Sequence, residues 1–173
     1  AVVEKKIVDE IKVELEKVNF SVIVFEFPAL ALARIVAGAL GETPEPVLVL
    51  RVSSDGLNLM IVKGGALYFD YFTSWRSIQG ESREIPKSVF DSVVALEVQK
   101  VLNFSLSRFK ASLKEILILA PGFDEDIKKL LQDRFSIAAT SFRLGSYSSL
   151  GVTWYAALGS AMRSMGDRNK DRE

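Results

Sequence analysis

The chain has 173 residues, with 22 Lys and Arg against 22 Asp and Glu, and contains neither cysteine nor histidine. Disulfides, thiol nucleophiles and thiolate metal ligands are therefore excluded, and the commonest general base and metal ligand is missing. The net charge of zero gives no electrostatic reason to expect a nucleic-acid partner. A hydrophobic content of 49% predicts a globular domain. Catalysis is left to carboxylate, lysine, tyrosine or bound-metal chemistry.

The first 46 residues predict a helix, a strand and a second helix. In residues 4–18 apolar side chains recur every three or four positions, which indicates an amphipathic helix. Residues 22–25 form a β-branched run typical of a parallel strand covered on both faces. Pro28 opens an apolar helix that is expected to end near Ala39. Residues 42–46 are rich in proline and acid and are predicted to be a linker.

After this linker the pattern changes to three strands, at residues 47–52, 57–62 and 66–73. The loops between them are short, and Gly64-Gly65 suits the positive φ angles of a tight hairpin, so antiparallel pairing is expected. A long helix follows, and Ser88 is expected to cap it. Its predicted buried stripe consists of Phe90, Val94, Val98, Val101, Leu102, Leu106 and Phe109.

The rest of the chain alternates strands and helices. We expect a strand at 116–119, a helix at 123–135, a strand at 137–142, a helix at 153–165 and a flexible tail at 166–173. From residue 47 the order is β-β-β-α-β-α-β-α, which predicts an α/β fold with a mixed sheet and helices on both faces. This is the order of the ribonuclease-H-like fold and of each lobe of the actin-like ATPases.

Four segments, in the right order, resemble parts of one family. Residues 46–62 resemble the first hairpin of its second lobe, and residues 25–34 resemble the strand and Ala-Leu-Ala-Arg helix that close its first lobe. Residues 97–102 resemble its Glu-Ile-x-Arg-Ser-Leu helix, and residues 154–163 resemble its Tyr-x-x-Ala-x-Gly-Leu-Ala-Leu-Arg helix. The family is that of the PilM proteins, actin-like components of type IV pilus assembly that are related to the cell-division protein FtsA.

The resemblance implies a protein of two lobes that clamp a nucleotide between them. It implies that residues 1–41 are the end of the first lobe, residues 42–46 the linker and residues 47–165 the second lobe. It also implies that the insertion subdomain of the first lobe is absent from this sequence. In the family that subdomain binds the N-terminal peptide of the membrane protein PilN.

The resemblance also indicates where a nucleotide would bind. Actin-like lobes bind phosphates with the backbone amides of a hairpin turn and hold the water shell of the metal with an Asp. Here the turn offers Ser53, Ser54 and Gly56, whereas Arg51 stands at the position of the Asp and cannot bind magnesium. The alternative is that these residues form only a hairpin turn.

Three more residues are candidates for binding adenosine. Gly122 stands where the family has Gly-Gly-Gly, although Pro121 removes one amide donor. Glu97 and Lys100 lie on one helix face and keep the Glu-x-x-Lys spacing that related ATPases use around adenosine. A plain βα turn and a surface ion pair are the structural alternatives. We therefore expect ATP or ADP with Mg²⁺ to bind weakly or not at all.

Two other groups have both a functional and a structural interpretation. The acidic run of residues 124–126 could hold a metal ion, but acids in the first turn of a helix favour the helix dipole, and we prefer that interpretation. Trp75 could mark a partner surface or pack at the edge of the sheet, and we prefer packing. Trp154 and Tyr155 are expected to pack between helix and sheet.

We expect a cytoplasmic actin-like scaffold or adaptor of a type IV pilus or related secretion platform, with a degenerate nucleotide pocket and weak or no ATPase activity. Inner-membrane proteins like PilN are the implied partners, and no nucleic acid is expected. The most apolar stretch, residues 20–40, contains Glu26, Pro28 and Arg34, so we predict no spanning helix and attachment to the membrane only through partners.

Two rival functions are considered. The first is an active actin-like ATPase of the same architecture, in which Arg51 compensates for the missing Asp and Glu97 and Lys100 hold adenosine. The second is a ribonuclease-H-like nuclease, which needs several carboxylates around two metal ions. Since the first strand of the predicted sheet ends in Arg51 instead of an Asp, the nuclease is disfavoured.

Overall fold

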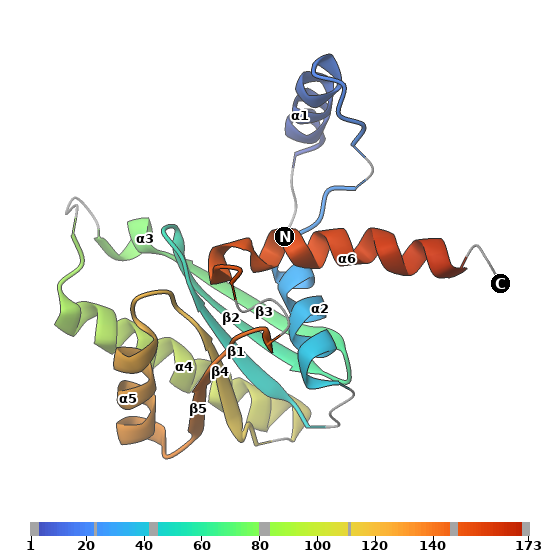
Figure 1. The fold of residues 1–173 in the computed structure, drawn as a ribbon. Helices are drawn as coiled ribbons and strands as arrows, with labels where there is room; N and C mark the ends of the chain where they lie inside the picture. Colours follow the sequence, from blue (N-terminus) through green and yellow to red (C-terminus); the bar gives the residue numbers. More distant parts are fainter. Residues whose placement is uncertain are drawn as a thin grey trace.

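The computed structural model describes residues 4–22, 24–41, 45–79, 84–110, 112–145 and 149–170, without the side chains of residues 164–170. In these ranges the strands form one five-stranded sheet in the order β3-β2-β1-β4-β5 (Figure 1). β1 pairs antiparallel with β2 and parallel with β4, β2 pairs antiparallel with β3, and β4 pairs parallel with β5. The strands are β1 (Val47–Val52), β2 (Gly56–Lys63), β3 (Ala66–Ser74), β4 (Glu115–Leu119) and β5 (Ala138–Ser141).

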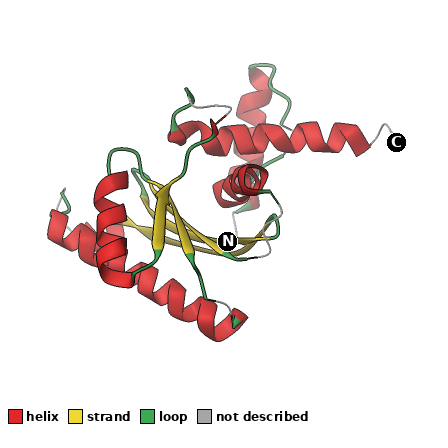
Figure 2. Ribbon diagram, turned by 60° about the horizontal axis from the view of Figure 1, so that its bottom comes forward, coloured by secondary structure: helices red, strands yellow, loops and turns green. Residues whose placement is uncertain are grey.

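Helices cover both faces of this sheet, as Figure 2 shows. One face carries the long α4 (Lys87–Phe109) and α5 (Asp124–Phe135), and the other carries α2 (Pro28–Leu40) and α6 (Tyr155–Lys170). A short α3 (Trp75–Gln79) follows β3, and a 3₁₀ turn, η2 (Val152–Trp154), precedes α6. The predicted fold class is confirmed. α2 precedes the predicted linker, yet it packs directly on the sheet.

The alternation of side chains along β1 explains why the strand is apolar throughout. Leu48 and Leu50 point into the core shared with α4 and α5, whereas Val47 and Val49 point into the core shared with α2. All four are buried, because a strand covered on both faces has no solvent side.

α2 and α6 cross very closely. A Cβ atom at Gly159 of α6 would lie 2.1 Å from the carbonyl oxygen of Ala31 in α2, so only glycine fits there. At the start of α6, the buried Tyr155 accepts a hydrogen bond from Leu144 N–H at 3.1 Å through its hydroxyl oxygen and meets Phe142 edge to face. The expected packing of Tyr155 is confirmed, but that of Trp154 is wrong, since the residue is 63% exposed.

The N-terminal part of the chain lies apart from the sheet, and we call residues 4–27 the arm. It contains α1 (Lys5–Lys17), which projects away from the rest of the molecule in Figure 1. The expected strand at 22–25 is wrong: residues 22, 24 and 25 lie in no strand, and Ile23 lies outside the described residues. A strand needs a neighbour for its backbone hydrogen bonds, and none of the five described strands pairs with this segment.

Three further expectations about helices need correction. Ser88 does not cap α4, because Pro86 holds the cap position and Ser88 lies inside the first turn. Leu106 is 59% exposed, since the neighbouring Ser105 takes the inward position on the helix. α6 continues to Lys170 rather than ending at residue 165, so helix replaces the first part of the predicted flexible tail. Residues 171–173 and the linker residues 42–44 lie outside the described residues.

In the part of the chain that the structure describes, no helix has both the length and the apolar character needed to span a membrane.

Candidate functional site

A hollow of about 350 Å³ lies at the carboxyl end of β1, between the β1–β2 turn, α3 and the first turns of α4 and α5. β1 and β4 are parallel, so both strands end at the same edge of the sheet, and the loops that follow them meet there. The hollow is lined by Val52, Ser53, Trp75, Gln79, Ile85, Lys87, Phe90, Phe123 and Asp126.

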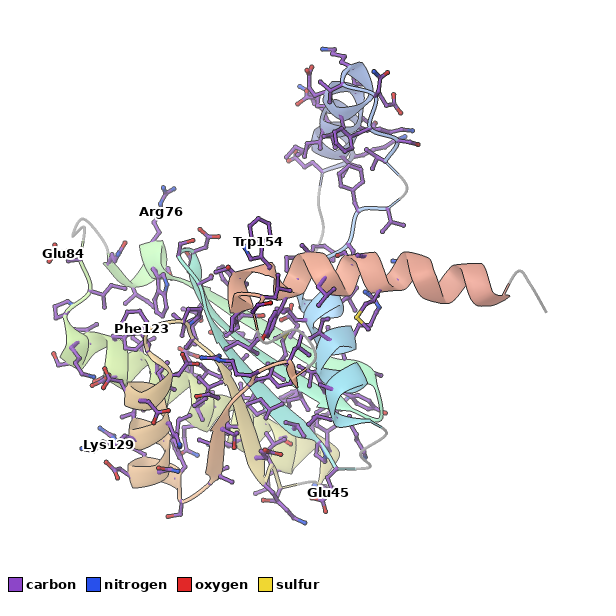
Figure 3. All side chains as sticks on the ribbon, in the orientation of Figure 1. Glu45, Arg76, Glu84, Phe123, Lys129 and Trp154 are labelled. Atoms are coloured by element: carbon purple, nitrogen blue, oxygen red, sulfur yellow. The ribbon has the colours of Figure 1, made fainter. Side chains whose placement is uncertain are left out.

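Three aromatic rings form the inner wall of this hollow. The ring centroid of Phe90 lies 5.6 Å from that of Trp75 and 5.5 Å from that of Phe123, both at tilted angles. Figure 3 places Phe123 at the upper end of α5. Such a wall suits a flat or apolar group of a ligand better than a phosphate.

The β1–β2 turn is held from two sides. Ser53 donates to the carbonyl oxygen of Gly56 through both its N–H (3.0 Å) and its hydroxyl (3.2 Å). Trp75 donates its indole N–H to the carbonyl oxygen of Ser53 at 2.7 Å and its backbone N–H to that of Asp55 at 3.0 Å. Trp75 is therefore a packing residue that fixes the turn, and the preferred interpretation is confirmed.

Gly56 has a structural reason to be glycine. An added Cβ would lie 2.2 Å from the carbonyl oxygen of Thr73 and 2.7 Å from the ring of Phe72. β3 and this aromatic ring therefore cover the glycine directly. Ser54, by contrast, is exposed, and among the described residues no backbone hydrogen bond uses its N–H.

Charged side chains form the rim of the hollow. Lys87 Nζ lies 3.1 Å from both carboxylate oxygens of Asp91 and 3.7 Å from Oδ2 of Asp126. The hydrogen bond to Asp91, with the charge of Asp126, raises the pKa of Lys87. In this arrangement the exposed Lys87 ammonium pairs with two carboxylates, and the Ser53 N–H bonds within its own turn.

The predicted site residues do not gather in one place. Ser53 lines the hollow, Ser54 and Gly56 belong to the same turn, and Gly122 directly precedes Phe123. Gly122 has a φ of 84° and nothing within 4 Å of an added Cβ, so glycine is required there by the backbone conformation and not by crowding.

Glu97 and Lys100 lie elsewhere on α4. Glu97 is seven residues beyond Phe90, about 10 Å along the helix. Its side chain is 8% exposed, and its Oε1 accepts a hydrogen bond from Lys100 Nζ at 2.9 Å, which raises the pKa of Lys100. Its Oε2 is buried, and no hydrogen-bond partner for it is found among the described residues. The two residues thus form an ion pair in which the Glu97 carboxylate is buried and the Lys100 side chain is 54% exposed.

The acidic run at the start of α5 diverges. Asp124 pairs with Arg143 at 3.3 Å on one side, whereas Asp126 faces Lys87 on the other. Within the described ranges, no group of three metal-ligating side chains comes together. The three acids occupy the first turn of the helix, where they complement its dipole.

Arg51 lies away from the aromatic hollow. Side chains alternate along β1, so Arg51 shares the face of Val49, whereas Val52 lines the hollow on the other face. Sequence reasoning missed Lys87, Phe90, Phe123 and Asp126 as members of one site. The available signal was an aromatic residue in the first turn of α4, Phe90, and another at the N-cap of α5, Phe123.

Comparisons with known proteins show a likeness in the fold. The PilM chain of a "PilM-PilN type IV pilus biogenesis complex" superposes with a TM-score of 0.65 over 90% of this chain, at 16% identity. The fold is that of an actin-like lobe. The chain spans 57% of the length of that PilM chain.

A second structure, an "AlfA Filament bound to AMPPNP", superposes with a TM-score of 0.41 over 79% of this chain and 44% of its own, at 14% identity. No family model matches the actin-like lobe described here, and no curated protein does.

Proposed function

We propose that this chain is part of a cytoplasmic actin-like scaffold or adaptor in a type IV pilus assembly platform or a related secretion platform. The observation that carries the proposal is the superposition on PilM over 90% of the chain. In this proposal the arm, residues 4–27, belongs to the end of a first lobe, and α2 packs on the sheet of the second lobe, residues 47–165. The whole protein is held at the inner membrane by a PilN-like partner.

The proposed role is mechanical, and the nucleotide pocket is degenerate. Three features support this proposal: the Ser53 N–H is used within its own turn, Lys87 faces two carboxylates, and Glu97 and Lys100 lie about two helical turns from the hollow.

The partner is tested by isothermal titration calorimetry of the whole natural protein with the cytoplasmic N-terminal peptide of the PilN-like protein from the same cells. A saturable one-to-one complex is expected. The 173-residue chain is the matched control and is expected to give no heat, because the proposal assigns peptide binding to a part of the first lobe that is not among these residues. Absence of binding by the whole protein would contradict the scaffold.

The nucleotide is tested separately on the same whole protein. Titration with a fluorescent ATP analogue and Mg²⁺ is expected to show weak or no saturation, and phosphate release is expected to stay at background. The alternative, an active ATPase, rests on the Glu97–Lys100 spacing. It predicts Mg²⁺-dependent phosphate release that Lys100→Ala abolishes, while the exposed control Lys129→Ala leaves it unchanged.

A further inference from the structure

Glu26 lies at the point where the arm joins the sheet layer. It stands two residues before Pro28, the first residue of α2, and its side chain is only 4% exposed. The arm around it is not held by apolar burial, since Val24, Phe25 and Phe27 are between 43% and 47% exposed. Whatever fixes the direction of the arm must therefore be mainly polar.

Four hydrogen bonds converge on the carboxylate of Glu26. Arg34 of α2 donates to both oxygens, at 2.6 Å to Oε1 and 3.0 Å to Oε2. From α6, Ser160 donates to Oε2 at 3.3 Å and Arg163 donates to Oε1 at 3.4 Å. Each oxygen thus receives two donors, and a bidentate guanidinium is a strong and directional partner for a carboxylate.

Arg34 also connects the two helices that cross above the sheet. Its Nη1 donates to the carbonyl oxygen of Gly159 at 2.6 Å, and Gly159 is the residue at which α6 touches Ala31 of α2. The same guanidinium therefore binds the arm and the crossing point of α2 and α6. A shift of the arm changes the bonds that Arg34 can make to α6.

We infer that Glu26, Arg34 and Arg163 form a latch that fixes the arm relative to α6, and that opening this latch frees the arm to reorient while the sheet stays folded. The sheet has its own apolar cores on both faces, and none of the described arm residues is buried in either. The role between two lobes rests on the proposed function, but the latch itself depends only on these contacts.

The test measures the distance between two spin labels by pulsed electron resonance. The chain has no cysteine, so Glu10→Cys on α1 and Gln132→Cys on α5 place labels on two exposed sites only. With the latch intact a narrow distribution is expected, and in Glu26→Gln a distribution about twofold wider is expected, since a locally held segment then samples more orientations. Glu14→Gln is the matched control, because it breaks only the exposed Lys17 pair within the arm.

A Glu26→Gln distribution as narrow as that of the parent, or a parent distribution already as wide as that of the variant, would overturn the latch. If Glu26→Gln does not fold, Ser160→Ala and Arg163→Ala decide by the same criterion, because both remove weaker donors at the α6 side. The distance measurement needs neither a partner protein nor a nucleotide. A result that contradicts the latch therefore says nothing about the proposed function, which the calorimetry and the nucleotide titration test.

Discussion

α1 and α2 have the same length but opposite environments. Each has 13 residues, yet none of those in α1 is buried, whereas α2 buries Ala29, Ala31, Leu32, Ala33, Ile35 and Val36. The apolar residues of α1 recur at helical spacing and stay in solvent, with Ile7 and Ile11 46% and 44% exposed. A 13-residue helix is marginal in water without tertiary contacts. Periodicity therefore predicts where a helix forms but not what covers it.

The largest difference in the free energy of unfolding is expected when one apolar side chain is truncated in α2 and one in α1. Leu32→Ala empties a site that is 1% exposed and should lower the free energy of unfolding by about 3 kcal/mol. Ile11→Ala on α1 should change it by less than about 0.5 kcal/mol. Urea unfolding followed by tryptophan fluorescence measures both. Equal losses would mean that α1 is buried as deeply as α2 in solution.

Glycine-to-alanine replacements in α6 and α2 test how closely these two helices cross. Gly159→Ala pushes a methyl group into Ala31. It should lower the free energy of unfolding by about 2 kcal/mol, despite the better helix propensity of alanine. Gly38→Ala in α2 is the control, because its Cβ would lie 3.6 Å from Met162, and it should stabilise by about 0.5 kcal/mol. A stable Gly159→Ala variant would place the two helices farther apart than described.

The arm should contribute to stability in a pH-dependent way through Glu26. The hydrogen bond from Arg34 lowers the pKa of Glu26 in the folded state below its usual 4.5, with Ser160 and Arg163 acting in the same direction. Its stabilisation is therefore present above that unfolded-state value and is lost as pH falls through the folded-state pKa. Glu26→Gln should lower the free energy of unfolding by about 1.5 kcal/mol near neutral pH.

Urea titrations at neutral and strongly acidic pH check this expectation. The difference between the parent chain and Glu26→Gln should shrink on acidification. A difference that is constant with pH would show that the carboxylate is not held in its charged form by Arg34.

The smallest effect is expected within α1 itself. Glu14 and Lys17 form an ion pair at 2.5 Å, but their side chains are 69% and 62% exposed. Exposed pairs of this kind contribute less than about 0.5 kcal/mol. Glu14→Gln should therefore leave the unfolding midpoint and its salt dependence unchanged within error. A clear loss of stability would indicate that the arm is structured by more than these contacts.

The same limit of local reasoning applies to the candidate site. The turn of Ser53 and Gly56 was predicted at the correct place, because hairpin chemistry is local. The family resemblance groups Glu97 and Lys100 with this turn. In the structure they lie on α4, about two helical turns beyond Phe90, which lines the hollow beside the turn. Phe90 and Phe123 meet across 33 residues of chain, so no spacing rule brings them together.

Sequence alone determined the five longer helices and the five strands of the described sheet, because apolar periodicity and turn residues act within a few positions along the chain, but it did not predict the short α3. It also determined the order that makes an actin-like lobe, since short connections leave few ways to pair consecutive strands. Tertiary structure decided that residues 22–25 form no strand, that Gly159 must be glycine, and that Glu26 is held by two helices. Each of these depends on a neighbour distant in sequence, and a strand or a buried charge exists only where such a neighbour supplies its hydrogen bonds.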